Sequence, residues 1–424
     1  MSTTPRTIIV IGGGAAGHMA AISAKQHAPH AEVLLLEKSD KWLAKVRISG
    51  GGRCNVTHNC AEPRKLARHY PRGEAFVRKL FAAWGQPEAV AWFAQHGVAL
   101  KTEPDGRMFP TTDDSRTVID ALQGAAHKLG VQSRLHCAVS KLERVDVQGP
   151  LRETRHRSAV EGWQVTTPNG VLHADRVVVA SGGSPKDEGM NWLRALGHEA
   201  VPAVPALFTF NLPDDPICAL MGVVAPRARL RIAGSKLEST GPLLITHWGL
   251  SGPAVLRLSA FGARVLHDAQ YTYTVLVDWL GDMDEGPARE QLLKQAEEHP
   301  KRQLANAEGF ALPARLWSYL LQRAGLQPEK PLGELGKKGM DRLLDVLTND
   351  RYAAKGKTTF KEEFVTAGGI ALHQVEPNTL ESRVAPGLHF AGEVLDIDGI
   401  TGGFNFQAAW STGWLAGKAA GMGL

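Results

Sequence analysis

The sequence predicts an α/β protein whose chain begins with a strand, a helix and a second strand of a parallel sheet. Residues 7–11 are a short β-branched apolar run, as expected of a strand buried on both faces. An alanine-rich segment over 15–28 predicts a helix, and residues 32–36 predict the next strand. The intervening turn, Gly12-Gly13-Gly14-Ala15-Ala16-Gly17, fits G-x-G-x-x-G, and Glu37 lies 20 residues after its last glycine. Together these features indicate a Rossmann-like dinucleotide-binding unit.

Each residue of this turn has an expected physical role. Gly12 makes the tight turn, Gly14 lets the backbone approach a pyrophosphate, and Gly17 permits close packing of helix on sheet. The N–H groups of Ala15 and Ala16 begin the helix and attract phosphate. The carboxylate of Glu37 accepts hydrogen bonds from ribose hydroxyls and repels a 2′-phosphate.

Composition limits the class of protein. The chain has 424 residues, of which 43% are hydrophobic and 21% charged, so we expect a globular protein of two or three domains. The net charge of +5 permits an anionic partner. The four cysteines, Cys54, Cys60, Cys137 and Cys218, form no C-x-x-C and no zinc spacing, which predicts no metal site and a reducing, cytoplasmic location. The N-terminal apolar run has no basic n-region, and no segment is long enough to span a bilayer.

The C-terminal part of the chain favours FAD over NAD as the nucleotide. Residues 388–393, "LHFAGE", predict a strand that ends at Gly392-Glu393, where a carboxylate suits the ribityl hydroxyls of a flavin. A second glycine turn and helix follow, and the N–H groups from Gly402 to Asn405 suit the pyrimidine carbonyls. Residues 176–185, "RVVVASGGSP", predict another buried strand and glycine turn that closes over the cofactor.

These motifs carry a resemblance to a known family. The stretches "ISGGGRCNVT" (48–57), "GRMFP" (106–110), "THWGLSGPAVLRLS" (246–259), "VTAGGI" (365–370) and "GEVLDIDGITGGFN" (392–405) follow one another along nearly the whole chain. With them the chain resembles the BaiN-like (YhiN-type) FAD-dependent oxidoreductases, within the glutathione-reductase-type, two-dinucleotide-binding flavoproteins. It departs from the family pattern at Leu43-Ala44, where Gly and a basic residue are usual, at His58 in place of Asn, and at Ala408 in place of Trp.

The resemblance implies a Rossmann-like FAD-binding domain built from both ends of the chain, with a substrate domain inserted between them. We expect the FAD domain over 1–190 and 366–424, and the inserted domain over 191–365. Short β-like runs separated by Gly and Pro over 195–280 predict a β-barrel-like part, and helical periodicity over 285–350 predicts a small helical subdomain.

The triple glycine of "RISGGGRCNVTH" (47–58) is interpreted as a second loop facing the cofactor. In this loop Arg53 can offset phosphate charge, Asn55 can hydrogen-bond the ring or ribityl chain, and Cys54 fills space. The residues expected to contact FAD are therefore Gly12, Gly14, Ala15, Ala16, Gly17, Glu37, Lys38, Lys45, Ser49, Gly50, Gly51, Gly52, Arg53, Cys54, Asn55, Val139, Ser181, Gly182, Gly183, Gly392, Glu393, Asp398, Gly402, Gly403, Phe404 and Asn405.

The candidate catalytic residues are His247 and Arg107. The family match places His247 and Ser251 in a turn of the inserted domain that faces the flavin, where His247 could donate a proton or hold the substrate, or could simply cap a turn. Arg107 could hold an anionic or carbonyl group, or form a loop salt bridge. The chain has no second G-x-G-x-x-G, so NAD(P)H is expected to dock transiently.

The resemblance implies several substrate classes. One is a small molecule with an activated C=C bond, since relatives are associated with conjugated oxo-steroids. Others are uridine in ribosomal RNA, giving dihydrouridine, and a small aminoketone that is oxidised with oxygen. A non-catalytic flavin-binding protein is the fourth reading. The basic segment 64–79 and the basic residues between Lys337 and Lys361 would suit RNA, although solvated helix faces have the same composition.

Overall fold

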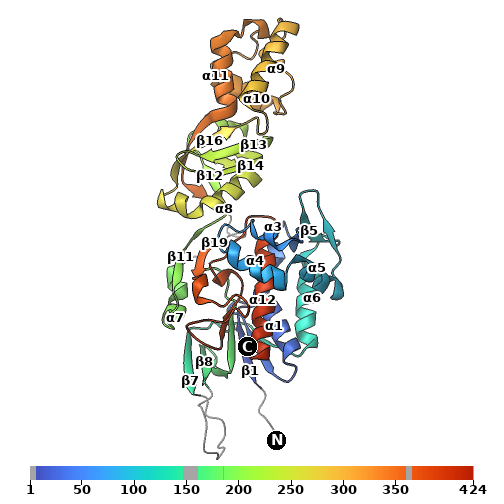
Figure 1. Ribbon diagram of the computed structural model, residues 1–424, viewed down its shortest axis with the longest axis vertical. Coiled ribbons are helices and arrows are strands. Elements are labelled where there is room, and N and C mark those ends of the chain that lie inside the picture. Colours follow the sequence, from blue (N-terminus) through green and yellow to red (C-terminus); the bar gives the residue numbers. More distant parts are fainter. Residues whose placement is uncertain (1–5, 147–160, 185, 360–364, 424) are drawn as a thin grey trace, which may run out of the picture. The chain divides into compact units, whose positions relative to one another are not determined.

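The structure, a computed structural model, describes residues 6–146, 161–184, 186–359 and 365–423. The chain divides into two compact units, one comprising Met1–Pro205 with Lys361–Leu424 and the other Ala206–Phe360 (Figure 1). These limits differ from the boundaries at 190/191 and 365/366 that the sequence predicts. The physical reason is that β11 (Ala200–Pro205) pairs with β19 (Thr366–Ile370), which attaches residues 191–205 to the first unit.

The first unit is organised around a five-stranded parallel sheet. Its order is β20 (Leu388–Phe390), β10 (Arg176–Val179), β1 (Thr7–Ile11), β2 (Glu32–Leu36) and β6 (Gln132–Arg134). The apolar residues of β1 and β10 are almost fully buried, as predicted for strands covered on both faces. Because all five strands run in the same direction, their carboxyl ends, and the loops that follow them, lie along one edge of the sheet.

Helix α1 (Ala15–His27) comes from the N-terminal part of the chain and helix α12 (Phe404–Met422) from the C-terminal part. The two helices pack against each other and lie side by side in Figure 1. Both present a small residue at every fourth position of the contact. Gly413, Gly417 and Gly421 of α12 lie against Ala16, Ala20 and Ala24 of α1. A Cβ on these glycines would lie 2.4, 2.1 and 2.8 Å from the alanine carbonyl oxygens, so only glycine permits this close approach.

The other elements of the first unit surround this framework. Its helices are α2 (Ala44–Ile48), α3 (Pro63–Ala67), α4 (Glu74–Ala83), α5 (Gln86–Gln95), α6 (Ser115–Lys128) and α7 (Asn191–Arg194). Its smaller sheets contain β3 (Thr57–His58), β5 (Arg107–Pro110) and β4 (Leu100–Thr102), and β7 (Lys141–Asp146), β8 (Glu161–Thr167) and β9 (Gly170–Ala174). Trp84 and Trp163 are buried in this unit.

The second unit contains a seven-stranded antiparallel sheet. Its order is β17 (Asp350–Lys355), β16 (Thr272–Asp278), β13 (Val224–Ile232), β14 (Glu238–Thr246), β15 (Gly249–Ser251), β12 (Thr209–Asn211) and β18 (Lys357–Thr358). The two edge strands, β17 and β18, are consecutive in the chain and are joined at Gly356, and β17 also contacts β12. The sheet therefore curls until its edges meet, as in a barrel.

Four helices accompany this sheet: α8 (Pro253–Asp268), α9 (Glu285–Glu298), α10 (Ala314–Arg323) and α11 (Gly336–Asn349). Helices α9, α10 and α11 gather at one end of the sheet in Figure 1. One hydrophobic core extends from the sheet, at Leu230 and Val277, into these helices, at Leu292, Leu320 and Leu343. The helical part is thus continuous with the sheet and not a separate domain.

Candidate dinucleotide site

The Gly12–Gly17 turn leads from β1 into α1 and has an open face. Gly12 has φ +113°, and a Cβ on it would lie 2.3 Å from the carbonyl oxygen of Ala180. A Cβ on Gly17 would lie 1.8 Å from the carbonyl oxygen of Gly12, so this glycine permits the helix to start against the strand. A Cβ on Gly14, by contrast, would meet nothing within 4 Å. The first turn of α1, with Ala15 and Ala16, therefore presents its N–H groups to open space.

Glu37, at the end of β2, is held in place by the turn itself. Its Oε2 accepts a hydrogen bond from Gly13 N at 2.7 Å, and its Oε1 accepts from both N and Oγ of Ser39 at 2.8 Å. A carboxylate has about four acceptor positions, so these three bonds leave capacity for a ribose hydroxyl. Lys38 is exposed. Sequence reasoning missed Trp42, whose ring lies so close over Gly13 that a Cβ there would be 2.3 Å away.

His18 lies beneath the turn and was also missed. It is 2% exposed, its Nδ1 lies 3.1 Å from the carbonyl oxygen of Gly14, and its ring meets Trp42 edge-on. Burial lowers the pKa of His18 from 6.5 to about 4, so the imidazole is neutral at pH 7. The only signal in the sequence is a histidine in the first turns of an alanine-rich helix.

The loop Ser49–Asn55 follows α2 and forms a compact turn. Gly50, Gly51 and Gly52 have φ of +58°, +70° and +84°, and a Cβ on Gly51 or Gly52 would meet nothing within 4 Å. Cys54 N donates to the carbonyl oxygen of Ser49 at 3.0 Å and closes the turn. The space beside Gly51 and Gly52 is thus open, whereas Gly50 packs against Phe109.

Cys54, which follows these glycines, and Leu43, which precedes α2, have unusual surroundings. The Cys54 thiol is fully buried, which raises its pKa to about 12 and keeps it protonated. Leu43, where glycine is usual in the family, has φ +55° at the N-cap of α2 and is buried. A leucine in this left-handed region is strained, and its burial in the core compensates.

The two arginines singled out in the sequence are held by carboxylates of the β4–β5 hairpin and its flanks. Arg53 Nη1 donates to Glu103 Oε1 at 2.6 Å, and its guanidinium lies 3.9 Å from the centre of the Phe109 ring. Arg107 Nη2 donates to Glu103 Oε2 at 3.0 Å, and its Nε donates to Asp105 at 2.7 Å. Both guanidinium groups form hydrogen bonds within the protein. A ligand at this loop would therefore contact its glycine backbone before these side chains.

The N-terminus of α12 meets the Ser49–Asn55 loop. With the Asn55 amide oriented to satisfy both its neighbours, its oxygen accepts from Gly403 N at 3.0 Å and its nitrogen donates to the carbonyl oxygen of Thr57 at 3.0 Å. The side chain of Asn405 makes two hydrogen bonds with the backbone of Gly399, at 2.8 and 2.9 Å. Both asparagine side chains thus shape the protein backbone, and a ligand would meet the loop and the helix N-terminus themselves.

Several residues that were expected near the flavin also support the N-terminus of α12. The Phe404 ring is buried against the rings of His58 and His69, at centroid distances of 4.6 and 4.3 Å. Gly402 has φ +124°, and its carbonyl oxygen lies 3.1 Å from His58 Nδ1. The buried carboxylate of Asp398 forms an ion pair with Arg72, whose side chain is 10% exposed. No local sequence pattern indicates this pair, because its two residues lie far apart in the chain.

The loops after β10 and β20 complete the edge of the sheet. Glu393 Oε1 accepts from Thr366 N at 3.0 Å, and its Oε2 pairs with Lys45 Nζ at 2.7 Å. A Cβ on Gly183 would lie 2.9 Å from the Glu393 carboxylate. Gly392 N donates to Thr412 Oγ1 of α12 at 2.8 Å. Ser181 is exposed, Gly182 has φ +76°, and Val139 is partly exposed in the loop after β6.

The residues present fit a dinucleotide. Gly14, Gly51 and Gly52 leave backbone uncovered where a Cβ would fill the space, and the two helices α1 and α12 both begin at a glycine N-cap without a capping side chain. One helix N-terminus can receive the pyrophosphate and the other a partial negative charge. Glu37 and Glu393, at the ends of β2 and β20, supply acceptors for hydroxyl groups.

His247 lies in the second unit. It occupies the tight turn between β14 and β15, its side chain is exposed, and its ring lies 4.1 Å from that of Trp248. Trp248 Nε1 donates to Thr209 Oγ1 at 3.0 Å, so the turn is anchored through the tryptophan while His247 points outward. Ser251 is buried in β15.

The described residues contain no cluster of three or more His, Cys, Asp or Glu side chains that could hold a metal ion. Within the same ranges, no helix has the length and apolar character that crossing a membrane requires. All four cysteines are free thiols.

The parallel sheet, the glycine turn at its centre and the second glycine-capped helix define a Rossmann-type, FAD-dependent oxidoreductase. The chain belongs to the family described as HI0933-like protein Rossmann domain, whose model matches residues 6–419. This confirms the resemblance on which the FAD prediction rests.

Two relatives match along nearly their whole length. A 3-dehydro-bile acid delta(4,6)-reductase of Clostridium scindens is 28% identical over 97% of this chain and 98% of its own. A ribosomal RNA dihydrouridine synthase of Escherichia coli is 29% identical over 96% of each chain. Among solved structures, a 3-ketosteroid delta1-dehydrogenase of Sterolibacterium denitrificans aligns over 99% of this chain and 100% of its own with a TM-score of 0.51 and 14% identity, a likeness of fold.

Proposed function

We propose that this oxidoreductase reduces a C=C bond that is conjugated to a carbonyl group. The names of the two relatives carry the proposal, because they describe one reaction on different molecules. A 3-oxo steroid with 4,6 double bonds and the uracil ring of uridine both have a C=C bond next to a carbonyl. Reduction adds a hydride to one carbon and a proton to the other. Bound FAD, once reduced by NADH or NADPH, supplies the hydride.

The chain's own residues would bind and orient the cofactor for this reaction. The N–H groups at the start of α1 and the Gly50–Gly52 backbone would hold the pyrophosphate, and Glu37 the adenosine ribose. Glu393, positioned by Lys45, would accept from the ribityl chain. The N-terminus of α12 would stabilise negative charge on the ring. A cytoplasmic location belongs to the same proposal, and the four free thiols support it.

His247 is the proposed proton donor and Arg107 a proposed substrate contact. The exposure of His247 on an anchored turn supports this role, since a histidine that only caps a turn would keep its ring nitrogens within the protein. The Arg107 side chain is 38% exposed despite its ion pairs, which supports this role.

The experiment is anaerobic. The purified protein is expected to be yellow and to release FAD on denaturation. NADH or NADPH should bleach the flavin, and a 3-oxo-Δ4 steroid should restore its absorbance with formation of the saturated ketone by mass spectrometry. Rapid recovery with oxygen and none with any conjugated ketone would instead indicate an oxidase. A flavin that no nicotinamide reduces would indicate a binding protein.

His247→Gln is expected to slow recovery of the flavin absorbance by about 100-fold or more, the usual contribution of a general acid. Bleaching by the nicotinamide needs no proton donor at the substrate and should be unchanged. If the variant and the wild type have equal rates in both half-reactions, His247 is excluded as the proton donor.

Uridine in ribosomal RNA is the second candidate substrate. The relatives named ribosomal RNA dihydrouridine synthases favour it, since they match this chain as fully as the bile acid reductase does. Mass spectrometry of ribosomal RNA from a deletion strain should then show a loss of dihydrouridine, restored by the wild-type gene.

A further inference from the structure

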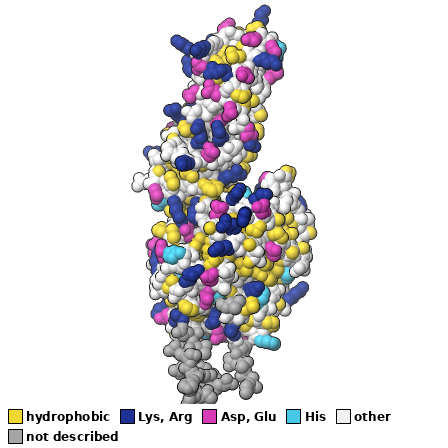
Figure 2. Space-filling model, in the orientation of Figure 1, with side chains coloured by type: hydrophobic (Ala, Val, Ile, Leu, Met, Phe, Trp, Pro, Cys, Tyr) yellow, Lys and Arg dark blue, Asp and Glu magenta, His cyan; other side chains and the backbone are white. Residues whose placement is uncertain are grey.

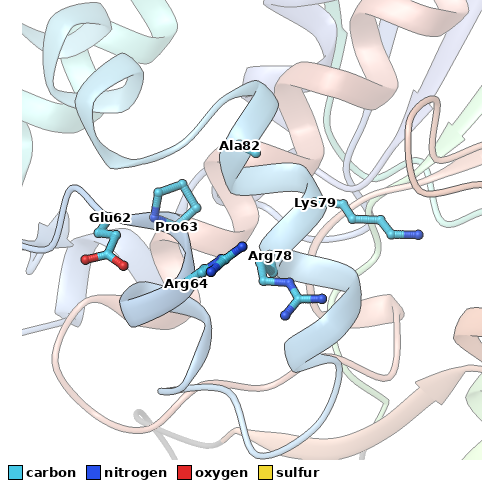
Figure 3. A pocket seen from close by; sticks show the side chains of 6 residues that line it. All are labelled: Glu62, Pro63, Arg64, Arg78, Lys79 and Ala82. Atoms are coloured by element: carbon cyan, nitrogen blue, oxygen red, sulfur yellow. The ribbon is translucent and has the colours of Figure 1, made fainter.

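A groove opens on the surface of the first unit between α3 and α4, with a volume of about 540 Å³ (Figure 3). Its lining residues are Glu62, Pro63, Arg64, Arg78, Lys79 and Ala82. In Figure 2, Lys and Arg side chains gather on the part of the molecule that α3 and α4 occupy in Figure 1. The groove is not part of the dinucleotide site described above.

The three cations that line this groove are not matched by ion pairs among the residues that the structure describes. Arg64, Arg78 and Lys79 are exposed, and none of them forms an ion pair or side-chain hydrogen bond with any described residue. Other arginines of the protein do: Arg194 pairs with Asp187, Arg289 with Glu285, and Arg383 with Glu376. Three unpaired cations from two helices around one groove create a local positive potential that attracts anions.

The single carboxylate of the groove does not offset this charge. Glu62 pairs with Lys65 at 2.8 Å, outside the three lining cations. Lys65 first, and then the nearby charges of Arg64 and Arg68, hold the pKa of Glu62 below its ordinary value. Glu62 therefore stays ionised and matched to Lys65, and the lining keeps its net positive charge.

The shape of the groove suits a chain of anions better than one small anion. Its cations are exposed and are contributed by two different helices, and its remaining walls, Pro63 and Ala82, are apolar. A site for a single small anion would enclose it with buried polar partners. Guanidinium groups on an open surface instead match successive phosphates of a nucleic-acid backbone, each accepting two parallel hydrogen bonds.

Side-chain contacts connect the segment after α3 to the start of α12. Tyr70, which follows α3, donates from its hydroxyl to the carbonyl oxygen of Phe404 at 2.5 Å, and Arg72 pairs with Asp398. Phe404 is the first residue of α12, whose N-terminus is proposed to face the flavin ring. A strand bound in the groove would rest on the segment that supports the reactive end of the cofactor.

We propose that the α3–α4 groove binds the phosphate backbone of an RNA substrate. The proposal rests on the second candidate of the proposed function, reduction of uridine in RNA, and assigns the surface that would position that substrate. Phosphate contacts at the groove position the RNA, and the uracil to be reduced is presented by the part of the strand that extends beyond it.

The test uses the FAD-loaded protein and fluorescein-labelled poly(U), with binding followed by fluorescence anisotropy. The variant Arg64→Gln/Arg78→Gln/Lys79→Gln should bind poly(U) at least about tenfold more weakly than wild type. The slope of log K against log salt should fall by roughly two, since each phosphate contact on a single strand contributes about 0.7. FAD content should be unchanged, because these residues lie outside the dinucleotide site.

The matched control is Lys337→Gln/Lys338→Gln/Arg342→Gln on α11. These three cations are also exposed, and the control removes the same charge from the second unit. It should bind poly(U) as wild type does. Equal weakening by both variants would mean attraction by net charge alone and would overturn the proposal.

Two further outcomes would also overturn it. Poly-L-glutamate that competes with poly(U) at equal charge concentration would indicate an acidic protein partner, and wild-type binding by the groove variant would exclude the groove. Steroid reduction is measured separately. If poly(U) binding behaves as expected but no conjugated C=C bond is reduced, the proposed function fails and the groove assignment stands.

Discussion

Gly417 of α12 lies against Ala20 of α1 so closely that a Cβ on the glycine would be 2.1 Å from the alanine carbonyl oxygen. The contact is the middle one of three, spaced one helical turn apart, between Gly413 and Gly421. It brings the C-terminal helix onto the helix that begins at the dinucleotide turn. Both helix N-termini are thereby fixed at the same edge of the sheet.

Substitution of this glycine should separate the two helices. Gly417→Ala is expected to lower the free energy of unfolding by about 1–3 kcal/mol, because the methyl group overpacks a backbone contact, and to weaken FAD retention. Flavin fluorescence during heating follows both the unfolding of the first unit and the release of FAD, because the dinucleotide site lies in that unit. The control is Gly124→Ala in α6, where a Cβ would meet nothing within 4 Å and stability should be unchanged or higher. Equal melting temperatures for both variants would contradict the packing argument.

Gly14→Val tests the open face of the turn. The backbone of Gly14 has φ −85°, which valine tolerates, and the new side chain would enter the space left for the pyrophosphate. The apo-protein should unfold at the wild-type temperature, whereas the Kd for FAD should rise at least about tenfold, or about 1.4 kcal/mol. Calorimetric titration of the apo-protein with FAD measures this. A variant that binds FAD normally would show that the pyrophosphate does not approach Gly14.

Arg72→Gln tests the buried ion pair below the start of α12. Asp398 is fully buried, and the substitution breaks its buried ion pair with Arg72, which typically costs about 3–5 kcal/mol. Denaturant unfolding should show this loss. The double variant Arg72→Gln/Asp398→Asn replaces the pair with two amides and should recover more than half of it. No recovery would mean that Arg72 acts through packing of its side chain instead.

The stability of the protein should fall on mild acidification. The pKa of His18 is lowered to about 4 in the folded protein by burial, against 6.5 in the unfolded chain. Between these values the unfolded state binds a proton that the folded state does not, so stability is complete above about pH 6.5 and decreases as the pH falls toward 4.

The readout is the difference between wild type and His18→Gln. Burial also lowers the pKa of His198 and His389, so the variant keeps part of the pH dependence. Unfolding free energies measured from pH 7 to pH 4 should decrease less steeply for His18→Gln. Parallel curves would show that His18 is not buried in its neutral form.

Much of the first unit could be predicted from local pattern. The strand at 7–11, the helix from 15 and the strand at 32–36 appear where the apolar runs and the glycine turn indicate, because each signal lies within a few residues of the element it specifies. The helices α9, α10 and α11 likewise follow the helical periodicity of 285–350. The boundary near residue 205 was misplaced because it depends on the pairing of β11 with β19, which are distant in sequence.

Local pattern also predicted which loops face the cofactor, but not which residues their side chains contact. Arg53 and Asn55 are residue types that suit phosphate and hydroxyl groups, yet in the fold one pairs with Glu103 and the other bonds to Gly403. Which partner a polar side chain finds depends on elements that arrive from elsewhere in the chain.

The sequence alone determined the elements of the nucleotide fold and the positions of its glycines, since backbone conformation at a turn is set by the residues in it. Only the tertiary structure decided that Arg72 neutralises Asp398, that His18 is buried neutral, and that α12 approaches α1 through glycine. Each of these depends on contacts between residues far apart in sequence, where burial and the absence of water fix the energy of a charge or a close approach.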